Sequence, residues 1–191
     1  MYLTELGYTY LSLKNAKWDE DTNIFSEIYT QSICKTNPEL DLKDADRIQS
    51  EISLLLEYED LGKAFYHRLE EQSGIKRIDF ENFDNNTFNV VKELPYKKEE
   101  EEFRPDIILL INGMPLSFIE VKKPHNLDGI QADYKRVARR NANKNFSKFI
   151  NSTQIMAFSN TLKYDNDSHM QQQGAFYAAR SYGNPALKHF S

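Results

Sequence analysis

RPDIILLINGMPLSFIEVKKP, residues 104–124, is the stretch of the chain that decides the fold. It contains two apolar runs of strand length, 107–111 and 116–121, both rich in Ile, Leu, Phe or Val. Between the runs stands Asn112-Gly113, a dipeptide that favours the left-handed backbone of a tight hairpin turn. The stretch therefore predicts a β-hairpin with a loop of about two to four residues around 112–115.

Charged residues mark the open end of this predicted hairpin. Asp106 begins the first strand, and Glu120 and Lys122 lie near the end of the second. A short loop places Asp106 opposite Glu120 to within about one position, with the two Cβ atoms ~5 Å apart. Glu120 and Lys122 are two positions apart, so strand alternation places both side chains on one face of the sheet. We expect the three side chains to converge.

These residue types suit metal-dependent hydrolysis of a phosphodiester. Asp106 and Glu120 offer the oxygen ligands that Mg²⁺ prefers, and the backbone carbonyl of Val121 could add another. Such a metal polarises a phosphate and lowers the pKa of a bound water. Lys122 would orient that water or stabilise the charge of the transition state. A purely structural hairpin with charged strand ends is the competing interpretation.

The elements around the hairpin predict an α/β fold with a mixed β-sheet flanked by helices, in a single domain of residues 1–191. We expect 1–74 to be its mainly helical part and 75–191 its core. The expected helices cover Asp21 or Thr22 to about Lys35, about 48–56, Asp60 to Gly74, 128–141 and 146–150, with a short helix end, a turn at Gly7 and a strand within 2–13. The other expected strands are 75–80, 88–94, 154–158 and 175–180.

The charge distribution gives a second functional indication. The net charge of -5 argues against a DNA partner, because DNA binding depends on neutralising phosphates with Lys and Arg. However, residues 135–148 contain six basic residues and no Asp or Glu. We expect phosphate contacts from four of them, Arg136, Arg139, Arg140 and Lys144. A solvated helix face is the alternative interpretation, and the acidic run Glu99–Glu102 is interpreted as a solvated loop.

Several classes of protein are disfavoured by what the sequence lacks. No apolar run reaches the roughly 20 residues that a membrane helix needs, so we expect no membrane partner. No secretory signal opens the chain and Cys34 is the lone cysteine, so we expect a cytoplasmic location. The four His residues are dispersed, which argues against a zinc site. No G-x-x-x-x-G-K-[ST] phosphate loop occurs, which argues against ATP binding by that mechanism.

The pattern Arg-Pro-Asp, apolar strand, Asn-Gly-x-Pro-Leu, apolar strand, Glu-x-Lys-x-Pro closely resembles the nuclease signature of type I restriction enzyme R subunits. These subunits carry an N-terminal nuclease domain of the PD-(D/E)xK superfamily. Residues 7–8, 78–95 and 153–160 also resemble that domain. The resemblance implies a restriction-endonuclease-like fold and Mg²⁺-dependent DNA cleavage, with Asp106 and Glu120 as metal ligands and Lys122 assisting catalysis.

The resemblance also implies partners: DNA, and the modification and specificity subunits of a type I restriction complex. R subunits are much longer and carry ATP-driven translocase domains, so ATP is expected only in domains that these residues do not contain. We therefore infer either a fragment of a longer motor subunit or a chain that works beside a separate motor.

This sequence departs from the family pattern in two places. Many relatives carry Gln-x-x-x-Tyr on the helix after the catalytic Lys, whereas here Gln131 is followed four residues later by Lys135, and Tyr134 has the wrong spacing. Relatives also carry a helical Glu well upstream of Gly-Tyr, for which Glu5 is a poor substitute. Two alternatives remain open: a catalytically silent module of nuclease-like fold that binds DNA or docks partner subunits, and a stand-alone PD-(D/E)xK nuclease.

Overall fold

The computed structural model describes residues 2–121, 132, 135–137, 139, 143–159, 176–179 and 188–189. Within these residues, seven strands form one mixed sheet in the order β1-β2-β5-β6-β7-β8-β9. The strands are β1 Thr9–Tyr10, β2 Phe88–Lys92, β5 Ile107–Ile111, β6 Met114–Val121, β7 Ile155–Ser159, β8 Phe176–Ala179 and β9 Lys188–His189. The pairs β1–β2 and β6–β7 are parallel, and the other neighbours are antiparallel.

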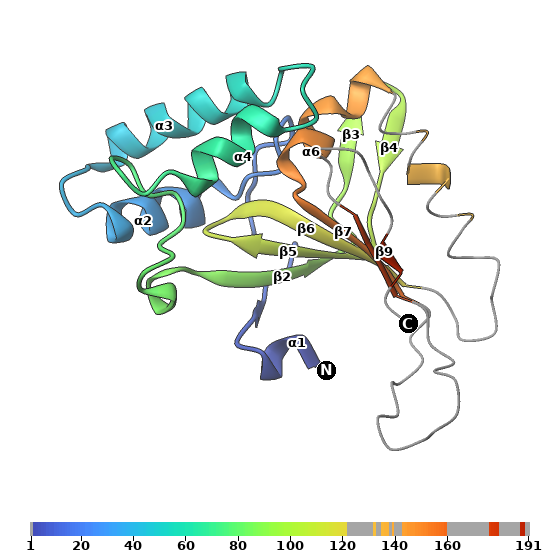
Figure 1. The fold of residues 1–191 in the computed structure, drawn as a ribbon, viewed down its shortest axis with the longest axis horizontal. Coiled ribbons are helices and arrows are strands. Elements are labelled where there is room, and N and C mark those ends of the chain that lie inside the picture. The colour runs from blue at the N-terminus through green and yellow to red at the C-terminus, as the bar shows by residue number, and fades with distance from the viewer. Residues whose placement is uncertain are drawn as a thin grey trace.

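Helices lie on both sides of this sheet (Figure 1). Those on one side are α2 Ser26–Thr36, α3 Leu42–Leu55, α4 Lys63–Glu70 and α6 Ser147–Ser152, while α1 Tyr2–Glu5 lies on the other. Two 3-10 helices, η1 Phe83–Asn85 and η2 Lys144–Phe146, and a hairpin of β3 Tyr96–Lys98 and β4 Glu101–Phe103 complete the described elements. The predicted α/β class, a restriction-endonuclease-like mixed sheet flanked by helices, is confirmed.

The β5–β6 hairpin forms as its turn residues predict. Asn112 and Gly113 have φ angles of 52° and 78°, and Ile111 pairs directly with Met114, so the turn has two residues. A Cβ atom on Gly113 would lie 2.8 Å from the carbonyl oxygen of Phe25. That close approach allows the Phe25 N–H to donate to the Gly113 carbonyl at 2.9 Å. The turn is thereby fixed against the start of α2.

The predicted strand over 75–80 is wrong. Side-chain amides from elsewhere in the chain bind the backbone there and take the place of a neighbouring strand. Asn37 accepts from the Lys76 N–H at 2.8 Å and donates to the Lys76 carbonyl at 2.9 Å. Asn86 binds the Asp79 N–H and carbonyl in the same way, at 2.9 and 2.8 Å. Residues 77–79 of the segment are buried, and its backbone is hydrogen-bonded without joining the sheet.

Three helix boundaries also differ from the prediction. The helix expected from Asp21 or Thr22 begins instead at Ser26, because the Asp19 carboxylate accepts from the Asp21 N–H at 2.9 Å and from the Thr22 hydroxyl at 3.1 Å. That local turn precedes the helix rather than capping it. The helix expected to reach Gly74 ends at Glu70. The helix expected over about 48–56 begins earlier, at Leu42, because Asp41 and Asp44 form a capping box there. The remaining predicted strands and helices outside 128–141 agree with the structure to within a few residues.

Two packed clusters support the β5–β6 hairpin. At its turn end, Met114 and Leu116 pack with buried residues of α2, α3 and α4. At its open end, Phe118 lies in an aromatic cluster with Phe103 of β4 and Phe149 of α6, with ring centroids 5.2 to 5.9 Å apart. The open end of the hairpin is therefore held in place by closely packed aromatic side chains. None of the helices in the described ranges combines the length and apolar character needed to cross a membrane.

Candidate active site

The β5–β6 register brings the two predicted carboxylate residues to the same end of the hairpin. Ile107 pairs with Ile119 and Ile108 with Phe118, so one further step of the same register sets Asp106 opposite Glu120. Oδ2 of Asp106 accepts a hydrogen bond from the Val121 N–H at 2.7 Å. This bond holds the Asp106 carboxylate against the backbone of the residue that follows Glu120.

Glu120 is an acidic residue in an apolar setting. It is 3% exposed, and alternation along β6 puts it on the same face as Phe118, at the margin of the aromatic cluster. Arg136 places Nη2 3.5 Å from Oε2 of Glu120. Burying a carboxylate is costly unless positive charge and hydrogen bonds compensate it. The burial of Glu120 therefore indicates a site that is organised around cations.

The donor set fits Mg²⁺ better than a softer metal. Asp106 and Glu120 provide carboxylate oxygens. Val121 directly follows Glu120, and its backbone carbonyl is a further oxygen donor. Mg²⁺ is usually held by one or two carboxylates, with waters and substrate phosphates completing its shell. Within the described residues, no group of three or more His, Cys, Asp and Glu side chains is arranged to hold a metal. These donors therefore fit a Mg²⁺ site whose remaining coordination positions are filled by waters and substrate phosphates.

Several predicted site residues lie outside the described residues. They include Lys122, the predicted catalytic cation, and Arg140, a predicted phosphate contact. Gln131 and Tyr134, which bear on the missing Gln-x-x-x-Tyr motif, also lie outside. The roles given to Lys122 and Arg140 stay predictions.

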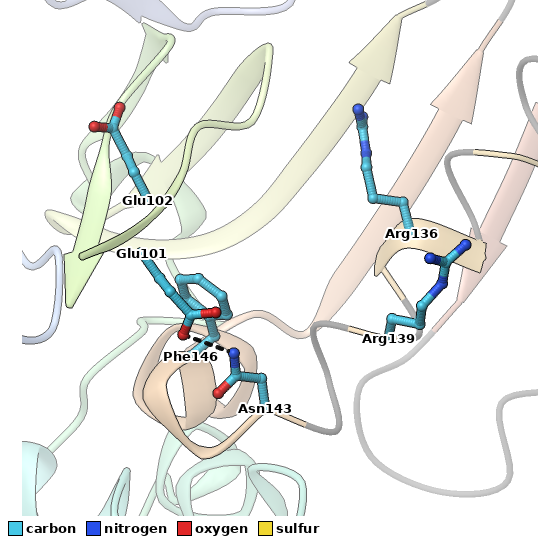
Figure 2. A pocket seen from close by; sticks show the side chains of 6 residues that line it. All are labelled: Glu101, Glu102, Arg136, Arg139, Asn143 and Phe146. Atoms are coloured by element: carbon cyan, nitrogen blue, oxygen red, sulfur yellow. Dashed lines mark hydrogen bonds between the residues drawn. The ribbon is translucent and has the colours of Figure 1, made fainter. Parts of the chain in front are cut away.

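Arg136 and Arg139 line a hollow of about 410 Å³ beside the carboxylates. Residues 135–137 and 139 are helical, and Val137 is buried in the aromatic cluster, which anchors this turn of helix. Arg136 and Arg139 are three residues apart and therefore share a face of the helix. Figure 2 shows the two arginine side chains extending in different directions, with Glu101 and Glu102 across the hollow.

The predicted phosphate contact Lys144 lies apart from the two arginines. Its Nζ forms an exposed ion pair with Glu59 at 2.6 Å, and that hydrogen bond raises the pKa of Lys144. Lys144 is not among the side chains that line the hollow. Of the four predicted contacts, the structure brings Arg136 and Arg139 together and leaves Lys144 on a separate surface.

Lys148, at the end of the same basic stretch, has a structural role. Its side chain is only 13% exposed, and its ammonium donates to Asp21, to Glu57 at 3.0 Å and to the Ser53 hydroxyl at 3.1 Å. Burial alone would raise the pKa of Asp21, but hydrogen bonds from Lys148 and Lys98 outweigh it and hold that pKa below its usual range. Lys148 thus joins α6 to the end of α3 and to the loop before α2.

The acidic run Glu99–Glu102 is exposed, as the sequence predicts, but Glu101 and Glu102 belong to a strand and not to a loop. It forms the turn and second strand of the β3–β4 hairpin. The Glu101 carboxylate accepts from the Asn143 and Asn145 side chains at 2.8 and 2.9 Å, and these bonds lower the pKa of Glu101. The overlooked signal was an aromatic residue at each end of the charged run, Tyr96 and Phe103, both fully buried.

A second hollow of about 410 Å³ is mainly apolar and is lined by residues of α4, β5 and β6. Leu109 and Ile111 contribute to it, and these residues alternate along β5 with Ile108 and Leu110 of the aromatic cluster. None of the predicted site residues lines this hollow. Within the described part of the chain, Asp106, Glu120 and Arg136 meet at the open end of the hairpin, whereas Lys144 does not join them.

Comparison with known proteins identifies the family of the chain. The family model for the type I restriction enzyme R protein N terminus matches residues 1–168. A Methanocaldococcus jannaschii protein, named as the MjaVIIP endonuclease subunit of a type I restriction enzyme, is 41% identical over 58 residues, 30% of this chain and 5% of that protein. The MjaIXP endonuclease subunit of the same organism is 43% identical over 53 residues, 26% of this chain and 5% of that protein.

These local matches cover only a small part of each curated relative, whereas the family model covers most of this chain. The matched family is the N-terminal part of the R protein, and the residue pattern of the central hairpin resembles that same part. The chain belongs to the type I restriction enzyme R protein N-terminus family.

Proposed function

We propose that the open end of the β5–β6 hairpin is a Mg²⁺-dependent DNA endonuclease site. The observation that carries this proposal is the pairing of Asp106 with the end of β6, where Glu120 is almost fully buried beside Arg136. Membership of the R protein N-terminus family supports it, as do relatives named as endonuclease subunits.

In this proposal Asp106 and Glu120 hold the metal, and the carbonyl of Val121 is a further candidate ligand. Bound Mg²⁺ would supply Lewis acidity to the scissile phosphate and lower the pKa of a coordinated water. Asp106 keeps its geometry through the hydrogen bond from the Val121 N–H. The aromatic cluster below Glu120 excludes water and strengthens electrostatic interactions at the site.

The cations of the chain would bind the DNA backbone. Arg136 and Arg139 line the hollow next to the carboxylates, where guanidinium groups can contact phosphate oxygens. Lys122 would stabilise the charge that develops on the phosphate or hold the attacking water in position. Phosphate contacts carry no sequence information of their own. We therefore propose that the modification and specificity subunits of a type I complex select the DNA, and that ATP acts on translocase domains elsewhere in the R protein.

Metal binding by the chain tests the first step of this proposal. We expect Mn²⁺, used as a probe for Mg²⁺, to raise the thermal midpoint of the wild-type chain by several degrees. Ligand at 100 times its Kd stabilises a folded protein by about 2.7 kcal/mol. Asp106→Asn and Glu120→Gln should lose most of this shift, because each removes the charge of a ligand. The measurement is a thermal denaturation series over Mn²⁺ concentration, with Mn²⁺ binding followed by electron paramagnetic resonance.

Glu102→Gln is the matched control, because it neutralises a carboxylate that lines the same hollow but pairs with Arg104. This variant should keep the wild-type metal shift. Equal shifts in all the proteins, or no Mn²⁺ binding by the wild-type chain, would contradict the proposed metal site. The second result would instead favour a module of nuclease-like fold that does no chemistry.

A further inference from the structure

Arg136 and a metal ion would compete for the same carboxylate. The Arg136 guanidinium lies 3.5 Å from Oε2 of Glu120, whose side chain is 4% exposed. Glu120 is also a proposed metal ligand, so its charge is compensated in part by Arg136 when no metal is bound. Two cations near one carboxylate repel each other, and full binding of the metal disfavours the ion pair.

The Arg136 side chain can also extend into the hollow that it lines, away from Glu120. Its side chain is 46% exposed and lines the hollow that also contains Arg139. Figure 2 shows Arg136 and Arg139 on the same turn of helix, above the loop that carries Asn143. Because Val137 fixes this turn in the aromatic cluster, the guanidinium can move by side-chain rotation while the helix stays in place.

The far wall of the hollow carries two carboxylates, and Arg136 and Arg139 lie opposite them. Its two carboxylates already have partners of their own: Glu101 accepts from Asn143 and Asn145, and Glu102 accepts from the Arg104 side chain at 2.9 Å. They are therefore held by neighbours other than Arg136 and Arg139. A phosphate group in the hollow would meet two guanidinium groups on one side of it.

We propose that Arg136 is a positioning residue that exchanges Glu120 for a DNA phosphate, so that metal loading and DNA binding favour each other. This inference rests on the proposed nuclease site. In the DNA-free chain Arg136 weakens metal binding by competing for Glu120. A phosphate in the hollow draws Arg136 away and opens Glu120 to the metal. By thermodynamic reciprocity, bound metal then strengthens DNA binding by the same factor.

The test measures Mn²⁺ affinity without DNA for wild-type chain, Arg136→Gln, Arg136→Lys and Arg139→Gln. We expect Arg136→Gln to bind Mn²⁺ about fivefold more tightly, the effect of losing an ion pair with one half-exposed partner. Arg136→Lys keeps the positive charge and should stay near the wild-type affinity. Arg139→Gln should bind Mn²⁺ like the wild type, because it lines the hollow without the Glu120 contact.

A second measurement separates competition from a structural effect. Binding to a short DNA duplex in the presence of a chelator should weaken in both Arg136→Gln and Arg139→Gln, because both side chains face the phosphate. A merely structural Arg136 would weaken Mn²⁺ and duplex binding together. If Arg136→Gln does not fold, Arg136→Met, which keeps the aliphatic stem, takes its place in both measurements.

The outcomes distinguish this inference from the proposed function. Unchanged or weaker Mn²⁺ binding in Arg136→Gln, with Mn²⁺ still bound by the wild type and lost in Glu120→Gln, would overturn the competition and leave the metal site in place. Absence of Mn²⁺ binding in the wild type and in every variant would overturn the proposed site itself.

Discussion

DNA cleavage by the complete restriction assembly is expected to fall by about a thousandfold or more when Asp106→Asn or Glu120→Gln is introduced into the R protein. Each change removes the charge of a proposed metal ligand while keeping the shape of the side chain. Lys122→Ala is expected to have a similar effect, since it removes the cation proposed to stabilise the transition state. The measurement is the rate of plasmid cleavage at saturating Mg²⁺ and ATP.

ATP hydrolysis in the same reactions provides the internal control. It should remain largely intact in all three variants, because the proposed site takes no part in translocation. Glu102→Gln, on the far wall of the hollow, should cleave at close to the wild-type rate. Persistent cleavage in all three variants would mean that the assignment of Asp106, Glu120 and Lys122 is wrong.

The largest effect on stability is expected from Phe149→Ala, at about 3–5 kcal/mol of unfolding free energy. Phe149 of α6 is fully buried, and its ring lies 5.2 Å from that of Phe103, 5.5 Å from Tyr96 and 5.9 Å from Phe118. Truncation leaves a cavity that rigid strands on both sides cannot fill. Urea denaturation followed by circular dichroism measures the change.

Phe80→Ala is the matched control, because the same side chain is removed from a position that is 52% exposed. We expect a cost below about 1 kcal/mol there. A cost below about 1 kcal/mol for Phe149→Ala as well would contradict the view that the aromatic cluster holds β4, β6 and α6 together. Since Phe118 and Glu120 share a face of β6, loss of this cluster should also weaken Mn²⁺ binding.

The central hairpin was predictable because its determinants are local. The strands 107–111 and 116–121 follow from composition, and Asn112-Gly113 has the backbone angles that its sequence favours. Counting from a two-residue turn sets Asp106 opposite Ile119, and a register shift between Leu109 and Leu110 moves the pairing by one residue, to Glu120. The candidate site could therefore be located from sequence to within one position, whereas the shift that completes the register could not be predicted.

Elements that depend on distant residues were not predictable. The segment 75–80 has the composition of a strand, but the side chains of Asn37 and Asn86 bind its backbone. No residue within the segment indicates these contacts. The β3–β4 hairpin has few apolar residues between its ends, so its charged run carries no alternating pattern. It is held by the buried rings of Tyr96 and Phe103 at its ends and by hydrogen bonds of Glu101 with Asn143 and Asn145.

The basic stretch shows the same distinction between composition and contact. Four of its six cations are predicted to contact phosphate, but the structure divides the described cations among different partners. Lys148 forms ion pairs with Asp21 and Glu57, and Lys144 pairs with Glu59. Arg136 instead reaches Glu120, a contact that helical spacing alone could not reveal. The sign of a charged segment is readable from sequence, whereas the role of each charge depends on what packs against it.

A crystal structure of the chain with Mn²⁺ would locate the metal. We expect one anomalous peak between the carboxylates of Asp106 and Glu120, with metal–oxygen distances of about 2.1 Å, and the Arg136 guanidinium moved away from Oε2 of Glu120. A map with no peak at this position, in crystals where Mn²⁺ has access to the open end of the hairpin and Arg136 still contacts Glu120, would contradict the proposed metal site.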